Sequence, residues 1–321
     1  MSVRVAAFYR FARLAPAGLG ALRGQLLATG EAGGVKGTVL LAGEGVNGTI
    51  SGPAAGVELL LEQLEAADPG LGGLEVKRHE APEQAFHRLK VRLKREIVTL
   101  GRPEVDACQA VGTYVAPQDW NALIRDPDTL VIDTRNGYEV AVGSFEGAID
   151  PGTASFREFP QWVEEQLRPL VQKRRPKALA LFCTGGIRCE KATAHLLREG
   201  FEGVHHLQGG ILRYLQVVEP AGSRWRGECF VFDQRVALDH HLQPGQHRLC
   251  HACRMPLSPA DRERPEYREG VSCHHCSAQL CAEDRIRFAE RERQVALARL
   301  RGEAHIGRVF PSPEAKGEPD A

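Results

Sequence analysis

A cysteine at the end of an apolar run, followed by two glycines and an arginine, is the feature of this sequence best suited to chemistry. Residues 178–182 read as a buried strand, and Cys183-Thr184-Gly185-Gly186-Ile187-Arg188 leads from it into a helix. Open α/β sheets bind ligands beyond the carboxyl ends of their strands, where Cys183 would lie. The glycines let successive backbone N–H groups from Thr184 to Ile187 turn toward one anion, and the helix start adds positive charge. The pattern predicts a reactive thiolate with a depressed pKa.

Arg188 comes five residues after Cys183 and would add a charge-assisted contact to the anion. An inert buried cysteine before a turn is the plainer alternative, but it gives no reason for the two glycines and the arginine. Cysteine phosphatases use a related loop with five residues between cysteine and arginine. Here only four intervene, which favours a smaller, sulfur-sized group over phosphate.

Three further residues near this loop have more than one reading each. Cys189 lies six residues after Cys183, one turn into the expected helix, so it could resolve a persulfide, form a disulfide with Cys183, or pack as a small apolar side chain, and packing is favoured. Asp133 and Arg135 follow a neighbouring strand and would either border the pocket or hold its loops by hydrogen bonds.

Two Cys-x-x-Cys pairs predict a metal site. Cys250 and Cys253 are separated by 19 residues from Cys273 and Cys276. Four thiolates at this spacing are typical of structural zinc, which would supply much of the folding energy of a segment with little apolar core. Cys281 is an alternative ligand, and the less favoured substitutes are His251, His274 and His275.

A period-two pattern of cations runs through residues 88–95. In a strand, Leu89, Val91 and Leu93 would lie on one face. The opposite face would carry the cations Arg88, Lys90, Arg92 and Lys94, with Arg95 at the end. This ribbon predicts phosphate binding, and the alternative is a charged edge strand that prevents aggregation.

The whole chain sets broad limits. Its 321 residues suffice for two or three domains, and 41 basic residues balance 41 acidic ones, so no global field favours nucleic acid. We expect no signal peptide, because the first residues lack a long apolar core, and no membrane span, because the apolar runs are too short. With nine cysteines read as ligands or thiols, we expect a soluble, cytoplasmic protein.

The pattern of strands and helices predicts a multidomain chain of α+β and α/β parts. Residues 1–105 read as β-α-β-β-α-β, the ferredoxin-like (acylphosphatase-like) order. Residues 113–219 alternate strands with helices, which predicts a parallel sheet covered on both faces. The expected strands are 129–133, 178–182 and 204–207, and the expected helices are 118–124, 159–171 and 188–199. Residues 220–310 form a Cys-rich zinc domain that ends in a helix over 283–301, and 311–321 a disordered tail.

Motifs in all three regions point to one bacterial family. Residues 118–219 resemble a rhodanese domain. The matching runs are Val131-Ile-Asp-Thr-Arg135 with Glu139, Gly147-Ala-Ile149, the Cys183 loop and Leu207-Gln-Gly-Gly-Ile211. The longer run Cys183-Thr-Gly-Gly-Ile-Arg-Cys-Glu-Lys191 is similar to the oxygen-dependent tRNA uridine hydroxylases, and so are residues 42–52 and 227–236.

The resemblance implies hydroxylation at C5 of the wobble uridine of certain tRNAs, with molecular oxygen as co-substrate. Cys183 would then be the essential residue, as a nucleophile or as a persulfide. The implied partners are tRNA, docked by the basic strand and the cationic zinc domain, and a sulfur-donor protein or a small sulfane-sulfur compound. No flavin, haem or iron-ligand motif is visible, so no organic cofactor is expected.

Two other functions stay open on the sequence. One is a general sulfurtransferase that carries sulfur from thiosulfate or a persulfide. Many plain sulfurtransferases place arginine directly after the cysteine, whereas this chain has Thr184, which favours the narrower family. The other is a non-catalytic rhodanese and zinc scaffold, which would have no need of both Cys183 and Arg188.

Overall fold

The computed structural model describes residues 3–303 and 305–306 of the chain. These residues form two compact units that divide between Arg248 and Leu249. The tail expected at 311–321 lies outside the described residues. Among the described helices, none combines the length and the apolar character that crossing a membrane requires.

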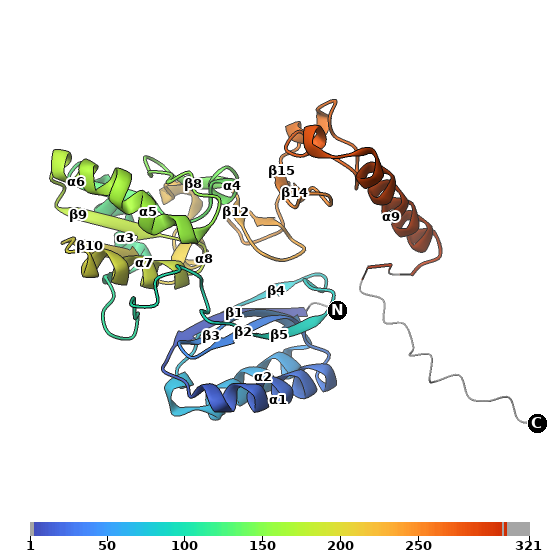
Figure 1. Cartoon of the computed structure of the whole chain (residues 1–321), viewed down its shortest axis with the longest axis horizontal. Helices are drawn as coiled ribbons and strands as arrows, with labels where there is room; N and C mark the ends of the chain where they lie inside the picture. Colours follow the sequence, from blue (N-terminus) through green and yellow to red (C-terminus); the bar gives the residue numbers. More distant parts are fainter. Residues whose placement is uncertain (1–2, 304, 307–321) are drawn as a thin grey trace, which may run out of the picture. The chain divides into compact units, whose positions relative to one another are not determined.

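The first region is a five-stranded sheet with two helices on one face (Figure 1). The strand order is β4-β1-β3-β2-β5. The bounds are β1 Val3–Phe11, α1 Leu19–Ala32, β2 Lys36–Ala42, β3 Gly45–Gly52, α2 Ala54–Ala67, β4 Glu75–Ala81 and β5 Leu89–Leu93, with 3-10 turns at Pro16–Gly18 and Pro69–Leu71. The first four strands confirm the expected ferredoxin-like order, and β5 adds an edge strand parallel to β2.

The two faces of this sheet differ because side chains alternate along each strand. Apolar residues of one face, among them Phe8, Val39 and Val91, pack against the helices. The face away from the helices carries polar side chains. The register of β1 and β3 pairs Tyr9 with Asn47, so both side chains lie side by side on this polar face.

The second region is a parallel sheet in the order β6-β10-β9-β7, with apolar clusters on both of its faces. Its strands are β6 Thr113–Val115, β7 Thr129–Asp133, β9 Ala178–Phe182 and β10 Val204–Leu207, and the last three have the expected bounds. The helices are α3 Pro117–Arg125, α4 Gly137–Val140, α5 Phe159–Trp162, α6 Arg168–Arg174, α7 Ile187–Arg198 and α8 Gly210–Val217, with a 3-10 turn at Phe156–Glu158. A π-helical turn, Val163–Leu167, joins α5 to α6 inside the helix expected over 159–171.

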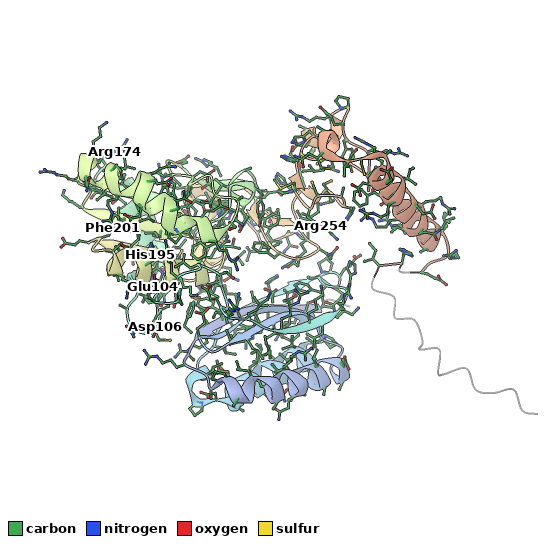
Figure 2. The ribbon with its side chains drawn as sticks, in the orientation of Figure 1. Glu104, Asp106, Arg174, His195, Phe201 and Arg254 are labelled. Carbon is green, nitrogen blue, oxygen red and sulfur yellow. The ribbon has the colours of Figure 1, made fainter. Side chains whose placement is uncertain are left out.

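The connection between the two regions is held to both of them. Arg13 of the first region bonds Asp106 of the connection at 2.7 Å, and Arg198 at the end of α7 donates to the carbonyl of Glu104 at 3.5 Å. Figure 2 labels Glu104 and Asp106, together with His195 of α7 and Phe201 of the loop that follows.

The first compact unit extends past the boundary expected at residue 219. Strand β11 Trp225–Gly227 pairs with β8 Gly143–Phe145, and β12 Cys229–Phe230 pairs with β13 Ala237–Leu238. Trp225, Cys229 and Leu238 belong to an apolar cluster of the second region. Burial of these side chains places residues 220–248 in the first compact unit.

The second unit is small and has few apolar side chains in its core. It contains β15 Pro256–Leu257, which pairs with β14 Arg248–Leu249 at the boundary, and the helix α9 Ala282–Leu300, close to the expected 283–301. Short 3-10 turns are Pro220–Gly222 in the first unit and Ala260–Glu263 and Ser277–Gln279 in the second. The buried cluster of this unit consists of three cysteines and Leu257.

Candidate functional site

Cys183 lies at the carboxyl end of β9, and its side chain is only 1% exposed. The N–H of Gly186 donates to its Sγ at 3.1 Å, and Gly186 has a φ of 101° that favours glycine. Burial alone would raise the pKa of the Cys183 thiol. Donation from the Cys189 thiol, the charge of Arg188 and the N–H groups of Cys189 and Gly186 outweigh burial and lower that pKa. The loop therefore favours a thiolate.

Cys189 lies in the first turn of α7 and is fully buried in the apolar cluster of the second region. Its thiol lowers the pKa of the Cys183 thiol, and its sulfur lies 3.6 Å from the hydroxyl oxygen of Thr134. Burial and the adjacent Cys183 thiolate raise the pKa of Cys189. Cys189 thus packs in the core and also favours the thiolate form of Cys183.

Arg188 lines the site, but its guanidinium has a partner of its own. Nη1 and Nη2 each lie 2.7 Å from an oxygen of Glu139, a bidentate pair in which Glu139 is fully buried. The charge of Arg188 lowers the pKa of Cys183, and a direct contact of Arg188 with a bound anion stays a prediction. Glu139 fixes the position of the positive charge beside the loop.

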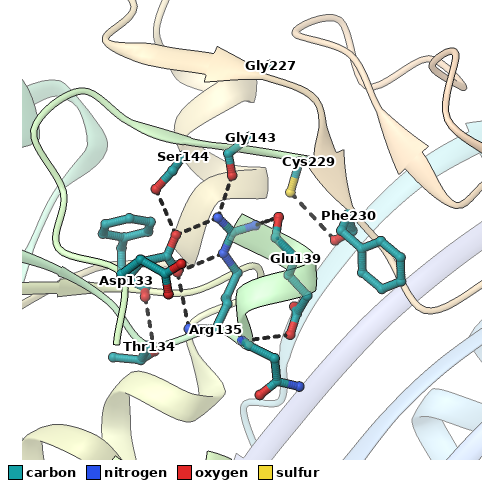
Figure 3. Close-up of polar contacts among 12 residues, drawn as sticks. Asp133, Thr134, Arg135, Glu139, Gly143, Ser144, Gly227, Cys229 and Phe230 are labelled. Atoms are coloured by element: carbon teal, nitrogen blue, oxygen red, sulfur yellow. Dashed lines mark hydrogen bonds and ion pairs between the residues drawn. The ribbon is translucent and has the colours of Figure 1, made fainter. Parts of the chain in front are cut away.

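Asp133 and Arg135 form a fully buried ion pair behind this site (Figure 3). Arg135 donates to Asp133 through Nε at 2.8 Å, and to the carbonyls of Glu139 at 3.3 Å and Gly143 at 2.6 Å. Neither residue is among those that line the cavity beside Cys183. Their contacts are those of the second reading, in which they hold the loops together by hydrogen bonds.

A cavity of about 300 Å³ opens beside Cys183 within the first unit. The loop over residues 183–188, called here the rhodanese loop, contributes Cys183, Thr184, Gly185, Ile187 and Arg188. Two other parts of the chain complete the wall. From the polar face of the first sheet come Tyr9, Asn47, Thr49, Lys77 and His79, and from the segment after β12 come Val231, Phe232, Asp233 and Arg235.

Tyr9 connects the first sheet to the rhodanese helix through two carboxylates. Its hydroxyl oxygen lies 2.8 Å from Glu75 Oε2 and 2.8 Å from Glu190 Oε1. One hydroxyl proton serves only one of these contacts, so one carboxyl must hold a second proton. Glu75 Oε1 lies 2.6 Å from the ammonium of Lys77. Burial, reinforced by the charges of Glu75 and Cys183, raises the pKa of Glu190, which we assign as the proton holder.

Two lysines also link the domains. Lys77 of β4 donates to the carbonyl of Gly185 in the rhodanese loop at 2.8 Å. Lys191 of α7 is 1% exposed and lies 2.6 Å from Glu96 and 2.8 Å from Glu44. The run that follows Cys183 thus supplies, in Glu190 and Lys191, contacts that dock the first domain.

The basic ribbon lies on the edge strand β5, on the same face of the sheet as the cavity wall. Lys90 pairs with Thr38 and Arg92 with Leu40, and Leu40 in turn pairs with Asn47. Leu89 and Val91 pack toward the helices as expected, whereas Leu93 is 48% exposed. The remaining cations of the set are exposed: Arg88, Lys94 and Arg95.

The four expected metal-site cysteines meet in the second unit. The sulfur atoms of Cys250, Cys253, Cys273 and Cys276 all lie within 4.8 Å of one another, so this cluster could hold a metal ion. Three sulfur pairs are 3.7, 3.8 and 3.9 Å apart. Four sulfurs at about 2.3 Å from a tetrahedral zinc would be roughly 3.8 Å apart. Cys281 instead accepts a hydrogen bond from the N–H of Asp284.

Sequence reasoning did not single out the cavity residues of the first and last segments. Tyr9, Lys77 and His79 carry no motif, because they become neighbours of Cys183 only when two domains pack. Asn47 and Phe232 do lie inside the quoted runs 42–52 and 227–236, which was the available signal.

Comparison with known proteins agrees with this domain plan. A UPF0176 acylphosphatase like domain matches residues 3–97, and a Rhodanese-like domain matches residues 116–216. The first match covers the five-stranded sheet, and the second covers the parallel sheet except β6.

Three bacterial relatives, each named tRNA uridine(34) hydroxylase, align along almost the whole chain. The relative from Parasynechococcus marenigrum is 58% identical, over 91% of this chain and 92% of the relative. That from Mesorhizobium japonicum is 56% identical over 95% and 97%, and that from Gluconobacter oxydans is 54% identical over 95% and 96%. Identity at this level across all three regions shows that the chain belongs to the family of the tRNA uridine(34) hydroxylases.

Proposed function

We propose that this protein hydroxylates C5 of the wobble uridine of tRNA in the cytoplasm, with molecular oxygen as co-substrate and Cys183 as the reactive residue. The observation that carries the proposal is the convergence of three distant motifs on one cavity. Asn47 comes from the run 42–52, Cys183 from the rhodanese loop and Phe232 from the run 227–236, and all three line it. A plain sulfurtransferase loop would not need walls from two other parts of the chain.

The thiolate of Cys183 is the nucleophile in this proposal, either toward the substrate or toward a sulfane-sulfur donor. The N–H of Gly186 at 3.1 Å stabilises negative charge on the sulfur, and Arg188 supports it through its fixed charge. The hydroxyl oxygen of Thr184 is buried, lines the cavity and has no hydrogen-bond partner in the described chain, so it is available to a bound group. A protein persulfide or a small sulfane-sulfur compound would be the donor.

The basic ribbon on β5 would dock the phosphates of the tRNA. In the sheet register, Lys90, Thr38, Thr49 and Ala7 follow one another from the edge strand to the cavity wall. A strand of RNA bound at the edge could therefore reach the cavity along one face. A quadruple change of Arg88, Lys90, Arg92 and Lys94 to Gln should raise the tRNA Kd at least tenfold and flatten its salt dependence. Equal affinity with parallel salt slopes would favour edge protection instead.

The cysteine cluster would hold one structural zinc ion through Cys250, Cys253, Cys273 and Cys276. The geometry of the sulfurs and the small apolar core of the unit support this assignment. The metal would order the residues around it. No step of the reaction is assigned to it.

The proposal is tested by nucleoside mass spectrometry of tRNA from cells that lack the protein. Wild-type complementation should restore 5-hydroxyuridine, and Cys183→Ser should not, although it should fold normally. Cys108→Ser, a change at an exposed cysteine, is the matched control and should restore it. Normal 5-hydroxyuridine in the Cys183→Ser strain would refute the assigned nucleophile. Fast turnover of thiosulfate and cyanide without tRNA hydroxylation would identify a general sulfurtransferase.

A further inference from the structure

The amide of Asn47 is held in one orientation at the wall of the cavity. Its Nδ2 lies 3.0 Å from the carbonyl oxygen of Ile97. A carbonyl only accepts hydrogen bonds, so the NH₂ end must face Ile97, and Oδ1 is fixed as the free acceptor. Among the described residues, none donates a hydrogen bond to Oδ1.

The orientation of Asn47 is supported by a second layer of contacts. The N–H of Ile97 donates to Glu44 Oε1 at 2.6 Å. Glu44 in turn accepts from Lys191 at 2.8 Å. The carbonyl that orients Asn47 is thus fixed by the same ion cluster that docks the two domains, and Asn47 itself is half-buried.

An exposed aromatic ring lines the same cavity. Phe232 is 63% exposed, although large apolar side chains normally favour burial. Phe230 packs edge-on against it, with ring centroids 5.2 Å apart, and the guanidinium carbon of Arg188 lies 6.0 Å from the centre of the ring. Enzymes that modify bases commonly stack an extruded base on such a ring.

We propose that the cavity holds the target base extruded from the anticodon, with its ring stacked on Phe232 and its N3–H donated to Asn47 Oδ1. This inference rests on the proposed function. A volume of about 300 Å³ suits a ligand of nucleoside size. Uracil carries a hydrogen on N3, whereas cytosine has a bare acceptor there. An acceptor fixed at this wall therefore selects uridine over cytidine.

The test uses the full-length protein and anticodon stem-loop RNAs that differ only at position 34, which carries uridine, cytidine or 3-methyluridine. Affinities are measured at one salt concentration, because phosphate contacts are common to all three RNAs. Wild type should bind the uridine RNA about tenfold more tightly than the other two, the size expected of one base contact. The 3-methyluridine RNA removes the N3–H without changing the protein.

Variants then assign the contacts. Asn47→Ala should bring the uridine-to-cytidine ratio to within about twofold, because the acceptor is gone. Phe232→Leu should weaken all three RNAs alike, and Phe232→Tyr should restore binding because it keeps an aromatic face. Asn121→Ala is the matched control: this amide also donates to a carbonyl, that of Gly222 at 2.8 Å, but does not line the cavity. Its ratio should equal that of wild type.

The outcomes separate this inference from the proposed function. A full uridine preference in Asn47→Ala, or tight binding of the 3-methyluridine RNA by wild type, would overturn the base-reading assignment while hydroxylation stands. Absence of 5-hydroxyuridine formation by wild type would overturn the proposed function itself. Equal loss with Phe232→Leu and Phe232→Tyr would remove the stacking role.

Discussion

Replacing Lys191 by Met tests whether the first domain must be held against the rhodanese domain for the site to work. Lys191 Nζ lies 2.6 Å from Glu96, 2.8 Å from Glu44 and 3.0 Å from the carbonyl of Val98. Methionine fills much the same space without a charge. The change therefore leaves two carboxylates without their counter-ion and removes one docking contact.

The expected size of the effect follows from burial. Removing one partner of a buried ion pair costs about 3–5 kcal/mol. The side chains of Glu44 and Glu96 keep 24% and 17% of their exposure, so water partly replaces the lysine. We therefore expect the first unit to lose about 2–3 kcal/mol of unfolding free energy. For a unit of this size the Tm should fall by roughly 4–12 °C.

Thermal unfolding and 5-hydroxyuridine formation are measured on the same preparations. Lys177→Met is the matched control, because Lys177 pairs with Asp128 but is 77% exposed, and it should change neither quantity measurably. Lys191→Met should lower tRNA hydroxylation while Cys183 still reacts with a small alkylating reagent, since the strand β9 and the helix α7 that hold the two ends of the loop both belong to the rhodanese domain. Unchanged Tm and full hydroxylation in Lys191→Met would refute the role of domain docking.

Three further predictions follow from the site and the metal cluster. The pKa of Glu190 is raised in the folded state, so the folded protein holds an extra proton and loses stability as pH rises from the unfolded pKa to the folded one. Glu190→Gln keeps a donor at this position without titrating, so it should flatten the fall in Tm between pH 5 and pH 8. Superimposable pH profiles of Tm for wild type and Glu190→Gln would contradict the proton assignment. Cys189→Ala removes a thiol that lowers the pKa of Cys183, so the alkylation rate of Cys183 should inflect at a higher pH, and an unchanged inflection would exclude that effect. Cys250→Ser should lose about one bound zinc per chain by elemental analysis and loosen residues 249–300 while the first unit keeps its Tm, whereas retained zinc would exclude Cys250 as a ligand.

Part of the fold could be predicted because β7 and β9 are short and mostly apolar runs that are buried in a parallel sheet. β10, with two histidines between Val204 and Leu207, has a weaker pattern. β6 was missed because it has three residues, of which Thr113 and Tyr114 are exposed. A cysteine-rich composition does not reveal that Trp225 and Leu238 pack into the preceding core.

The site could be predicted only as far as local sequence determines it. The strand, the glycines and the arginine around Cys183 lie within one short run, so the thiolate loop could be read directly. The partner of Arg188 is Glu139, 49 residues away, and the hydroxyl that meets Glu190 belongs to Tyr9, 181 residues away. Contacts of this kind depend on tertiary packing, which short-range periodicity does not encode.

The first turn of α7 explains why the functional residues after Cys183 are consecutive in the sequence and not spaced three or four residues apart on one face of the helix. Successive residues of an α-helix point about 100° apart, so four of them cover the whole circumference. Arg188 through Lys191 are all buried, and their side chains point to all sides of the helix. Arg188 binds the carboxylate of Glu139, and Cys189 lowers the pKa of Cys183. Glu190 accepts from the tyrosine of the first sheet, and Lys191 pairs with two carboxylates of the same region. A helix buried on every side cannot rotate or shift one contact without disturbing the others. The helix that tunes the reactive sulfur therefore also positions the wall that faces it, so loosening the domain contact should impair catalysis even when the loop remains intact.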